Sequence, residues 1–188
     1  MRSQEAIIAE LTDSMLEFIK QLVIEGDRAV VVLGAARIDV ALEHLLKAVM
    51  VHHSGGADNL FEPDRPLGTF SAKIALAYRL NLIDSDIEHA LQMIRKVRND
   101  FAHSITRSSL SESHHKNRVA ELNKATAKSL SSDGIPHQVT ICSAISSKLA
   151  STELSQFCAA VTVLLIQLEV AVARVEPFQP TYKATLAP

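Results

Sequence analysis

The feature that most constrains the fold is an apolar segment from about residue 27 to 52, which reads RAVVVLGAARIDVALEHLLKAVMV from Arg28 onward. It is too long and too rich in alanine for a β-strand, although VVVL alone resembles one. Wound as a helix, the segment is apolar on nearly every side. Because such a helix is stable only when other elements enclose it, we expect it at the centre of a helical bundle.

Five other segments have apolar residues at helical spacing, at about residues 4–24, 69–80, 85–103, 117–131 and 152–176. Thr69 is the expected N-cap of one helix, and Ser85 with Glu88 forms a capping box at the start of the next. Aromatic residues make up only 4% of the chain, which favours helices packed on helices over a β-sandwich. We therefore predict an all-α, single-domain bundle of about five to seven helices, with one long central apolar helix.

The predicted domain covers residues 1–176, and residues 177–188 form an extended or mobile tail with two prolines. Between the second and third helices, residues 52–68 form a long loop in which Leu60 and Phe61 are expected to anchor to the core. Asn81 is expected to end the third helix in the left-handed conformation. Residues 132–138 are predicted to form a turn.

Charge and cysteine content limit the function classes. The formal net charge is −2, so the concentrated basic surface that duplex DNA requires is not expected, nor is direct DNA binding. Cys142 and Cys158 lie in apolar surroundings and are interpreted as small buried residues in a reducing compartment. The apolar window 157–173 is interrupted by Gln167 and Glu169, and we interpret it as a buried helix that is too short and too polar to span a membrane. No secretory signal is recognised, which places the protein in the cytoplasm.

One arginine departs from the pattern of the helix that begins near Ser85. Arg98 follows Ile94 by four residues and Leu91 by seven, which predicts a position near the centre of the apolar face. An unpaired buried charge costs several kcal/mol, so a carboxylate must meet this guanidinium or the guanidinium must face a cleft or another subunit. Asp39 and Glu43, spaced i, i+4 on the central helix, are the expected partners.

Two interpretations of this group remain open. The first is a structural brace between two central helices, since most buried ion pairs are not active sites. The second is an anion or nucleotide site that includes Asn99 and His103. In a continuous helix His103 lies roughly 140° around from Arg98, so the two side chains converge only at a helix end or with a partner chain.

Three collinear blocks resemble the mannitol operon repressor family: RAVVVLGAARIDVALEHLLKA, LFEPDRPLGTFSAKIALAYRLNLID and IRKVRNDFAHS, covering roughly residues 28–104. The resemblance implies an all-helical domain and a role in transcriptional repression of a sugar-alcohol operon. Its characteristic positions in this chain are Arg37, Asp39, Glu43, Pro66, Leu67, Gly68, Phe70, Ser71, Lys73, Arg98, Asn99, Phe101, Ala102 and His103. The segment from about 105 to 150 has no counterpart in the resemblance.

The stretch RNDFAH, residues 98–103, also resembles the Arg-x4-His pattern of HEPN domains, several of which are dimeric ribonucleases. That resemblance implies that His103 acts as an acid or base at a ribose hydroxyl and that Arg98 stabilises phosphate charge. As a bare pattern the spacing arises often by chance, so its weight comes from the helix-end position and the adjoining Asn99.

The sequence gives weaker evidence for a binding site at other residues. Lys73 lies early in its helix, where the helix dipole disfavours a cation. This position suggests a carboxylate partner such as Glu62 or Asp64. A solvated surface lysine is the simpler interpretation. The pairs His52-His53 and His114-His115 lack the i, i+3 or i, i+4 spacing of zinc ligands, so no metal and no cofactor is assigned.

The sequence thus predicts a non-enzymatic transcriptional regulator that works through protein partners or an anionic ligand, at a cleft formed by Arg37, Asp39, Glu43, Lys73, Arg98, Asn99 and His103. Homodimer formation is compatible with the apolar faces of the second and last helices. The alternative is a HEPN-like, metal-independent ribonuclease or RNA-binding module that uses Arg98 and His103, with RNA as its partner.

Overall fold

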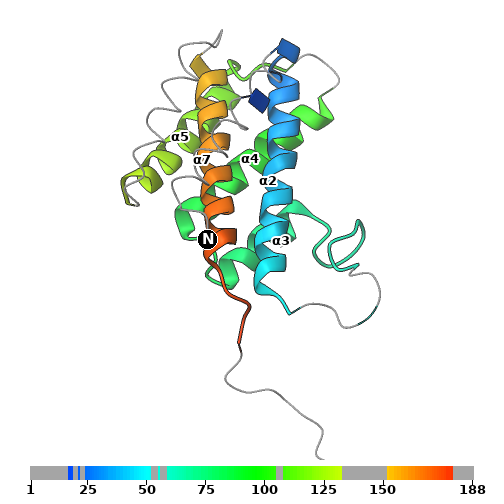
Figure 1. The fold of residues 1–188 in the computed structure, drawn as a ribbon. Coiled ribbons are helices and arrows are strands. Elements are labelled where there is room, and N and C mark those ends of the chain that lie inside the picture. Colours follow the sequence, from blue (N-terminus) through cyan, green and yellow to red (C-terminus); the bar gives the residue numbers. More distant parts are fainter. Residues whose placement is uncertain are drawn as a thin grey trace, which may run out of the picture.

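The computed structural model describes residues 17, 18, 21, 24–51, 55, 59–104, 108–132 and 152–179, with the side chains of 128–132 left aside. Five helices occupy this part of the chain: α2 (Asp27–Val49), α3 (Phe70–Arg79), α4 (Ser85–His103), α5 (Ser113–Ser132) and α7 (Thr152–Arg174). Figure 1 shows them as a helical bundle. The all-α prediction is confirmed, and no strand occurs among the described residues.

Among the described helices, α2 and α7 pack most extensively against each other. They run side by side in the same direction, since Gly34 in the first half of α2 faces Val161 in the first half of α7, and Phe178 N, just beyond α7, donates to Val49 O at the end of α2. One continuous core joins buried residues of all five helices. Apolar burial of this kind, at about 25 cal/mol per Å², is the main stabilising term of such a fold.

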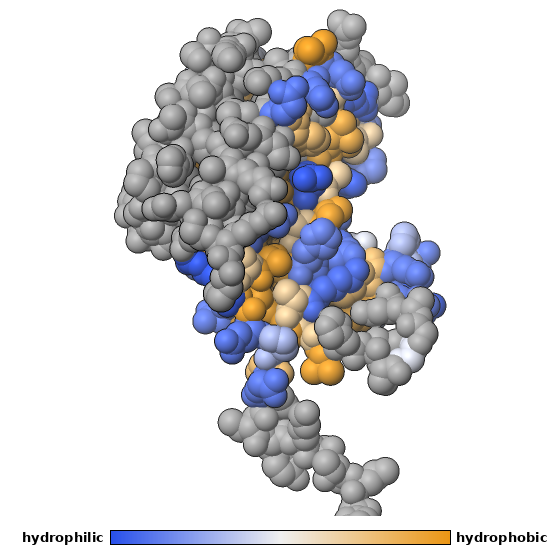
Figure 2. Space-filling view, viewed as in Figure 1, coloured by the Kyte–Doolittle hydropathy of each residue, from blue (hydrophilic) through white to orange (hydrophobic). Residues whose placement is uncertain are grey.

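Helix α7, and not α2, is the more enclosed of the two. Fourteen of its residues are buried, against ten in α2. On α2 a stripe with Leu33, Arg37, Val40 and His44 remains exposed, so the expectation that α2 is covered on every side is wrong. Figure 2 shows apolar patches scattered between hydrophilic groups on the described part of one face.

The buried-helix prediction for residues 157–173 is confirmed, but the expectation that the segment is too short to span a membrane is not. Helix α7 is 23 residues long and apolar enough to cross a membrane by length and composition, and it is the single described helix of which this is true. In the bundle, 67% of its most apolar window is buried, as in the core helix of a globular fold. Cys158 belongs to this core, where burial, aided by the charge of Asp27, raises the pKa of its thiol to about 12.

Local signals set the helix ends. Thr69 caps α3 as predicted, accepting a hydrogen bond from Ala72 N at 3.2 Å, and Asn81 takes the predicted left-handed conformation at φ 56°. The cap of α4 differs from the prediction by one residue. Asp84 accepts from Ile87 N at 2.8 Å, so Ser85 is the first helical residue and not the cap. A carboxylate at this position also complements the positive end of the helix dipole.

The loop before α3 is closely packed from Asn59 to Gly68. Phe61 is buried, as predicted, and Leu67 N donates to Leu60 O at 3.1 Å. A Cβ added to Gly68 would lie 2.2 Å from the carbonyl oxygen of Glu62, so this turn admits only glycine without a backbone shift.

Several sequence expectations concern residues outside the described part of the chain. These are most of the first helix at 4–24, the pair His52-His53, Cys142, the turn that begins near 132 and the tail from residue 180.

Candidate functional site

A buried lysine joins α3 to α2. Lys73 Nζ lies 2.8 Å from Glu43 Oε2 and 3.0 Å from Asp39 Oδ1, and only 5% of its side chain is exposed. The interpretation of Lys73 as a solvated lysine is therefore wrong, and both carboxylates come from α2. Because Lys73 lies in the first turn of α3, where the dipole disfavours a cation, two carboxylates are needed to hold it inside the fold.

In this group the hydrogen bonds and ion pairs together shift the pKa values more than burial does. Burial alone would lower the pKa of Lys73, but Glu43 and Asp39 reverse that effect and hold the pKa above its usual value. Burial would likewise raise the pKa of Glu43, but the hydrogen bonds from Lys47 and Lys73 lower it overall. Asp39 Oδ1 is itself buried, and its contact with Lys73 Nζ is the 3.0 Å ion pair.

Arg98 lies outside this group. Its side chain is exposed, and its guanidinium Nη1 donates to Asn99 Oδ1 at 3.1 Å. The buried face of α4 includes Ala90, Met93 and Val97. The centre of this face therefore points away from Arg98, and the arginine lies at the edge of the face. The prediction that Asp39 and Glu43 meet Arg98 is wrong because Lys73 already takes both carboxylates.

Arg37 also lies apart from the carboxylates. Its side chain is exposed on α2, and the guanidinium carbon lies 5.9 Å from the centre of the Phe18 ring, a distance that permits a cation–π contact. The seven predicted site residues therefore do not line one cleft. They form a group in which Asp39 and Glu43 flank the buried Lys73, a second group on the exposed side of α4, and the separate Arg37.

The exposed part of α4 is rich in polar side chains. Gln92 donates to Glu88 at 3.2 Å, and Arg95 Nε donates to Gln92 at 2.9 Å. Lys96 and Arg98 are exposed beyond them, Asn99 is partly exposed, and His103 is the exposed last residue of the helix. We call the set Arg95, Lys96, Arg98, Asn99 and His103 the α4 surface.

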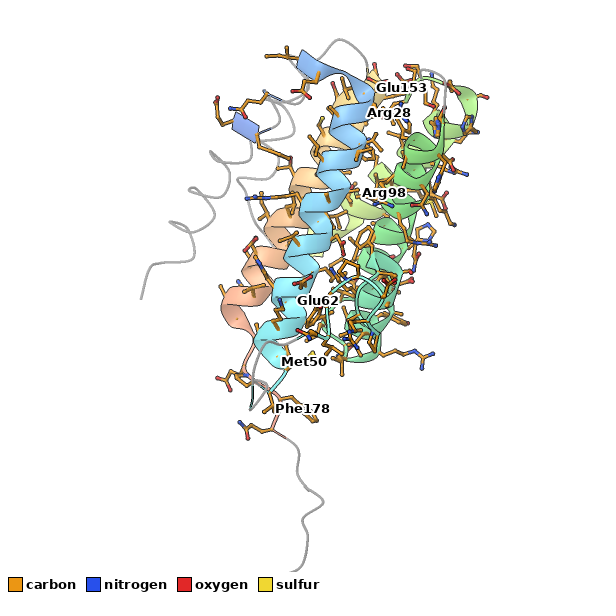
Figure 3. All side chains as sticks on the ribbon, turned by 90° about the vertical axis from the view of Figure 1, so that its right-hand side faces the viewer. Arg28, Met50, Glu62, Arg98, Glu153 and Phe178 are labelled. Carbon is orange, nitrogen blue, oxygen red and sulfur yellow. The ribbon has the colours of Figure 1, made fainter. Side chains whose placement is uncertain are left out.

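Residues that the sequence did not single out fix the end of α4. Arg28 Nη2 donates to the carbonyl oxygens of Phe101 and Ser104, each at 2.8 Å, and satisfies acceptors that every helix leaves open at its C-terminus. Beside it, Asp27 Oδ2 accepts from the hydroxyl of Ser109 at 3.0 Å and from Leu110 N at 2.9 Å. Figure 3 shows Arg28 and Glu153 at this end of the bundle, with Met50 and Phe178 at the other. These contacts join segments more than seventy residues apart, so no local signal predicts them.

The same end of the bundle holds a cluster of potential metal ligands. One ligand atom each from Asp100 on α4 and from His114 and His115 on α5 lie within 4.8 Å of one another. His115 is 1% exposed, its ring centre lies 4.8 Å from that of Phe101, and its Nδ1 has no hydrogen-bond partner among the described residues. Burial, with the neighbouring charge of His114, lowers the pKa of His115. The local spacing of zinc ligands could not predict this cluster, because Asp100 lies on a different helix from the two histidines.

Comparisons with known protein families, with curated proteins and with solved structures find no match to this chain.

Proposed function

We propose that this protein is a non-enzymatic transcriptional regulator, similar in kind to the mannitol operon repressor, and that it acts by binding an acidic protein partner through the α4 surface. The observation that carries the proposal is the exposure of Arg98 at a position where the sequence pattern predicts burial. An arginine held at the surface, one turn after Arg95, is available to pair with carboxylates of another molecule.

The internal charges support this assignment. Asp39 and Glu43 are the carboxylates that a brace between α2 and α4 would need, and both pair with Lys73. The cations of α4 are therefore not needed to neutralise α2. Arginine is also over-represented among the residues that carry most of the binding energy at protein interfaces.

The charge balance favours a protein partner over duplex DNA. The chain has 19 lysines and arginines against 21 aspartates and glutamates, and the α4 surface is too small a basic group to neutralise many phosphates. A few cations on one helix suit an acidic protein surface or a small anion. The proposal places the protein in the cytoplasm, without a cofactor.

The test is the transcript profile of cells that produce this protein, after deletion of its gene and complementation with variants. Arg98→Glu reverses the charge of the α4 surface at an exposed position, so it should leave the fold intact and reproduce the transcript changes of the deletion. Arg79→Glu is the matched control, because Arg79 is an exposed arginine on α3, away from the α4 surface. It should restore the wild-type profile.

Thermal melts of both purified variants accompany the profiles. The proposal fails if Arg98→Glu, folded and present at the wild-type level, restores the wild-type transcripts. It also fails if deletion changes no transcripts.

A ribonuclease of the HEPN type is the second candidate, and the exposure of both Arg98 and His103 on one helix favours it. Catalysis at RNA needs both side chains at a surface that the substrate reaches. The two are five residues apart on a continuous helix, so they point roughly 140° away from each other. Cleavage would therefore require a homodimer in which each chain completes the site of the other.

A further inference from the structure

We propose that Asp100, His114 and His115 form a binding site for a divalent transition-metal ion, with zinc as the first candidate. The three potential ligand atoms lie within 4.8 Å of one another, a separation that one ion bonded to all three could span after small side-chain movements. The site joins the last turn of α4 to the first turn of α5. It is independent of the proposed regulatory function.

The ring of His115 gives the second, independent observation. It is 1% exposed, and its Nδ1 is buried without a hydrogen-bond partner among the described residues. A buried polar atom without a partner destabilises the fold, so native folds rarely retain one unless a ligand satisfies it. The ring centre of His114 lies 3.8 Å from that of His115, which brings the second imidazole to the same place.

The ligand chemistry selects the class of metal. Two imidazole nitrogens and one carboxylate oxygen suit zinc and its first-row neighbours, whereas magnesium and calcium prefer oxygen ligands alone. Three protein ligands are also the number found where zinc keeps an open position for water. About half of the His114 side chain and 40% of the Asp100 side chain are exposed, so an ion can enter from solvent.

The surrounding charges decide how an ion would bind. Arg118 now pairs with Asp100, and the N-terminus of α5 also disfavours a cation. Glu112 partly offsets both, because its carboxylate lies 4.0 Å from His114 Nδ1. Metal binding would tie Asp100 on α4 to His114 and His115 on α5.

The experiment is a calorimetric titration of the purified chain, without a polyhistidine tag, with zinc chloride. The wild type should bind one zinc ion per chain. His114→Gln and Asp100→Asn each remove one ligand at an exposed position and should weaken binding at least about tenfold, as even indirect partners of metal ligands do. Cobalt bound in place of zinc should give visible absorption that both variants lose.

The matched control is His89→Gln. His89 also bridges α4 and α5, through a 2.9 Å contact with Glu121, but it lies outside the proposed ligand set. Its zinc affinity should equal that of the wild type, and thermal melts should show every variant folded. Absence of zinc binding to the wild type would overturn the proposal. So would affinity that is unchanged in both ligand variants, or that falls equally in His89→Gln, since either result would mean adventitious binding to surface histidines.

Discussion

At the scale of single residues, the buried cation Lys73 and its two carboxylates form the ion-pair group that joins α3 to α2. Breaking a buried ion pair by removing one partner is costly because the remaining charge is left without compensation. Asp39 and Glu43 are partly exposed, with 30% and 22% of their side chains reached by solvent, which moderates that cost.

We expect Lys73→Met to lower the free energy of unfolding by about 2–3 kcal/mol, below the full cost of stranding a fully buried charge. Lys47→Met is the matched control. Lys47 pairs with the same Glu43 at 2.6 Å, but its own side chain is 45% exposed, so its loss should cost less than about 1 kcal/mol. Urea denaturation of both variants measures the difference. Equal losses would contradict the assignment of Lys73 as the central cation.

The same group predicts a dependence of stability on pH. The pKa of Glu43 is lowered in the fold, so its contribution is present above its ordinary value of 4.5 and is lost as the pH falls through the lowered pKa. The pKa of Lys73 is raised, so its contribution is present below 10.5 and is lost as the pH rises through the raised pKa. Glu43→Gln should therefore flatten the loss of stability below pH 4.5, measured by denaturation at a series of pH values. An equally steep loss of stability below pH 4.5 in Glu43→Gln and in the wild type would contradict this account.

Arg98 and Lys73 show where sequence reasoning fails at this scale. Helical spacing predicts which residues share a face. Arg98 lies near the edge of the apolar face of α4, where a small rotation of the helix about its axis decides between burial and exposure. Asp39 and Glu43 do pair with a cation, but that cation is Lys73 and not Arg98. Which cation reaches them depends on how α3 docks on α2, and that is a property of the tertiary structure.

At the scale of elements, the start of α4 offers a direct comparison of two neighbouring cap candidates. Asp84→Ala removes the side chain that accepts the hydrogen bond of Ile87 N, so we expect a loss of about 1 kcal/mol in unfolding free energy. Ser85→Ala should cost only a few tenths of a kcal/mol, since Ser85 is exposed within the first turn. Thermal melts distinguish the two, and a larger loss in Ser85→Ala would restore the capping box read from the sequence.

The loop before α3 gives a second prediction. Gly68→Ala places a Cβ 2.2 Å from the Glu62 carbonyl oxygen and 3.2 Å from that of Arg65, so the turn must open. We expect a loss of about 2 kcal/mol or more in unfolding free energy, in the range typical of overpacking. Gly55→Ala is the control because no atom lies within 4 Å of its added Cβ. Similar stabilities for the two variants, measured by chemical denaturation, would show that the turn is not tight.

Helix positions were largely predictable because periodicity and caps are local. The predicted ranges for α2, α3 and α7 match the structure to within three residues at each end, and Thr69 and Asn81 act as expected. Helix α5 begins at Ser113, four residues before its predicted start, because the polar run with His114 and His115 hides its first turn. The contacts of Asp27 and Arg28 with the end of α4 carry no local signal at all.

At the scale of the whole molecule, the bundle turns its most apolar helix, α7, into the core and leaves the α4 surface outside. The carboxylates of α2 pair with Lys73 of α3, while Lys96 and Arg98 of α4 are exposed and the histidine cluster lies at the end of that helix. On this account, the function lies in what α4 binds and not in a reaction that it performs.

The most direct measurement is an RNA cleavage assay on the purified protein, run with and without zinc, beside His103→Ala and Arg98→Ala. We expect no cleavage that depends on His103, with all three proteins folded, because Arg98 and His103 point away from each other on α4. Cleavage by the wild type that disappears in a folded His103→Ala variant, with its thermal melt unchanged, would contradict the binding account. It would assign these residues to a ribonuclease site instead.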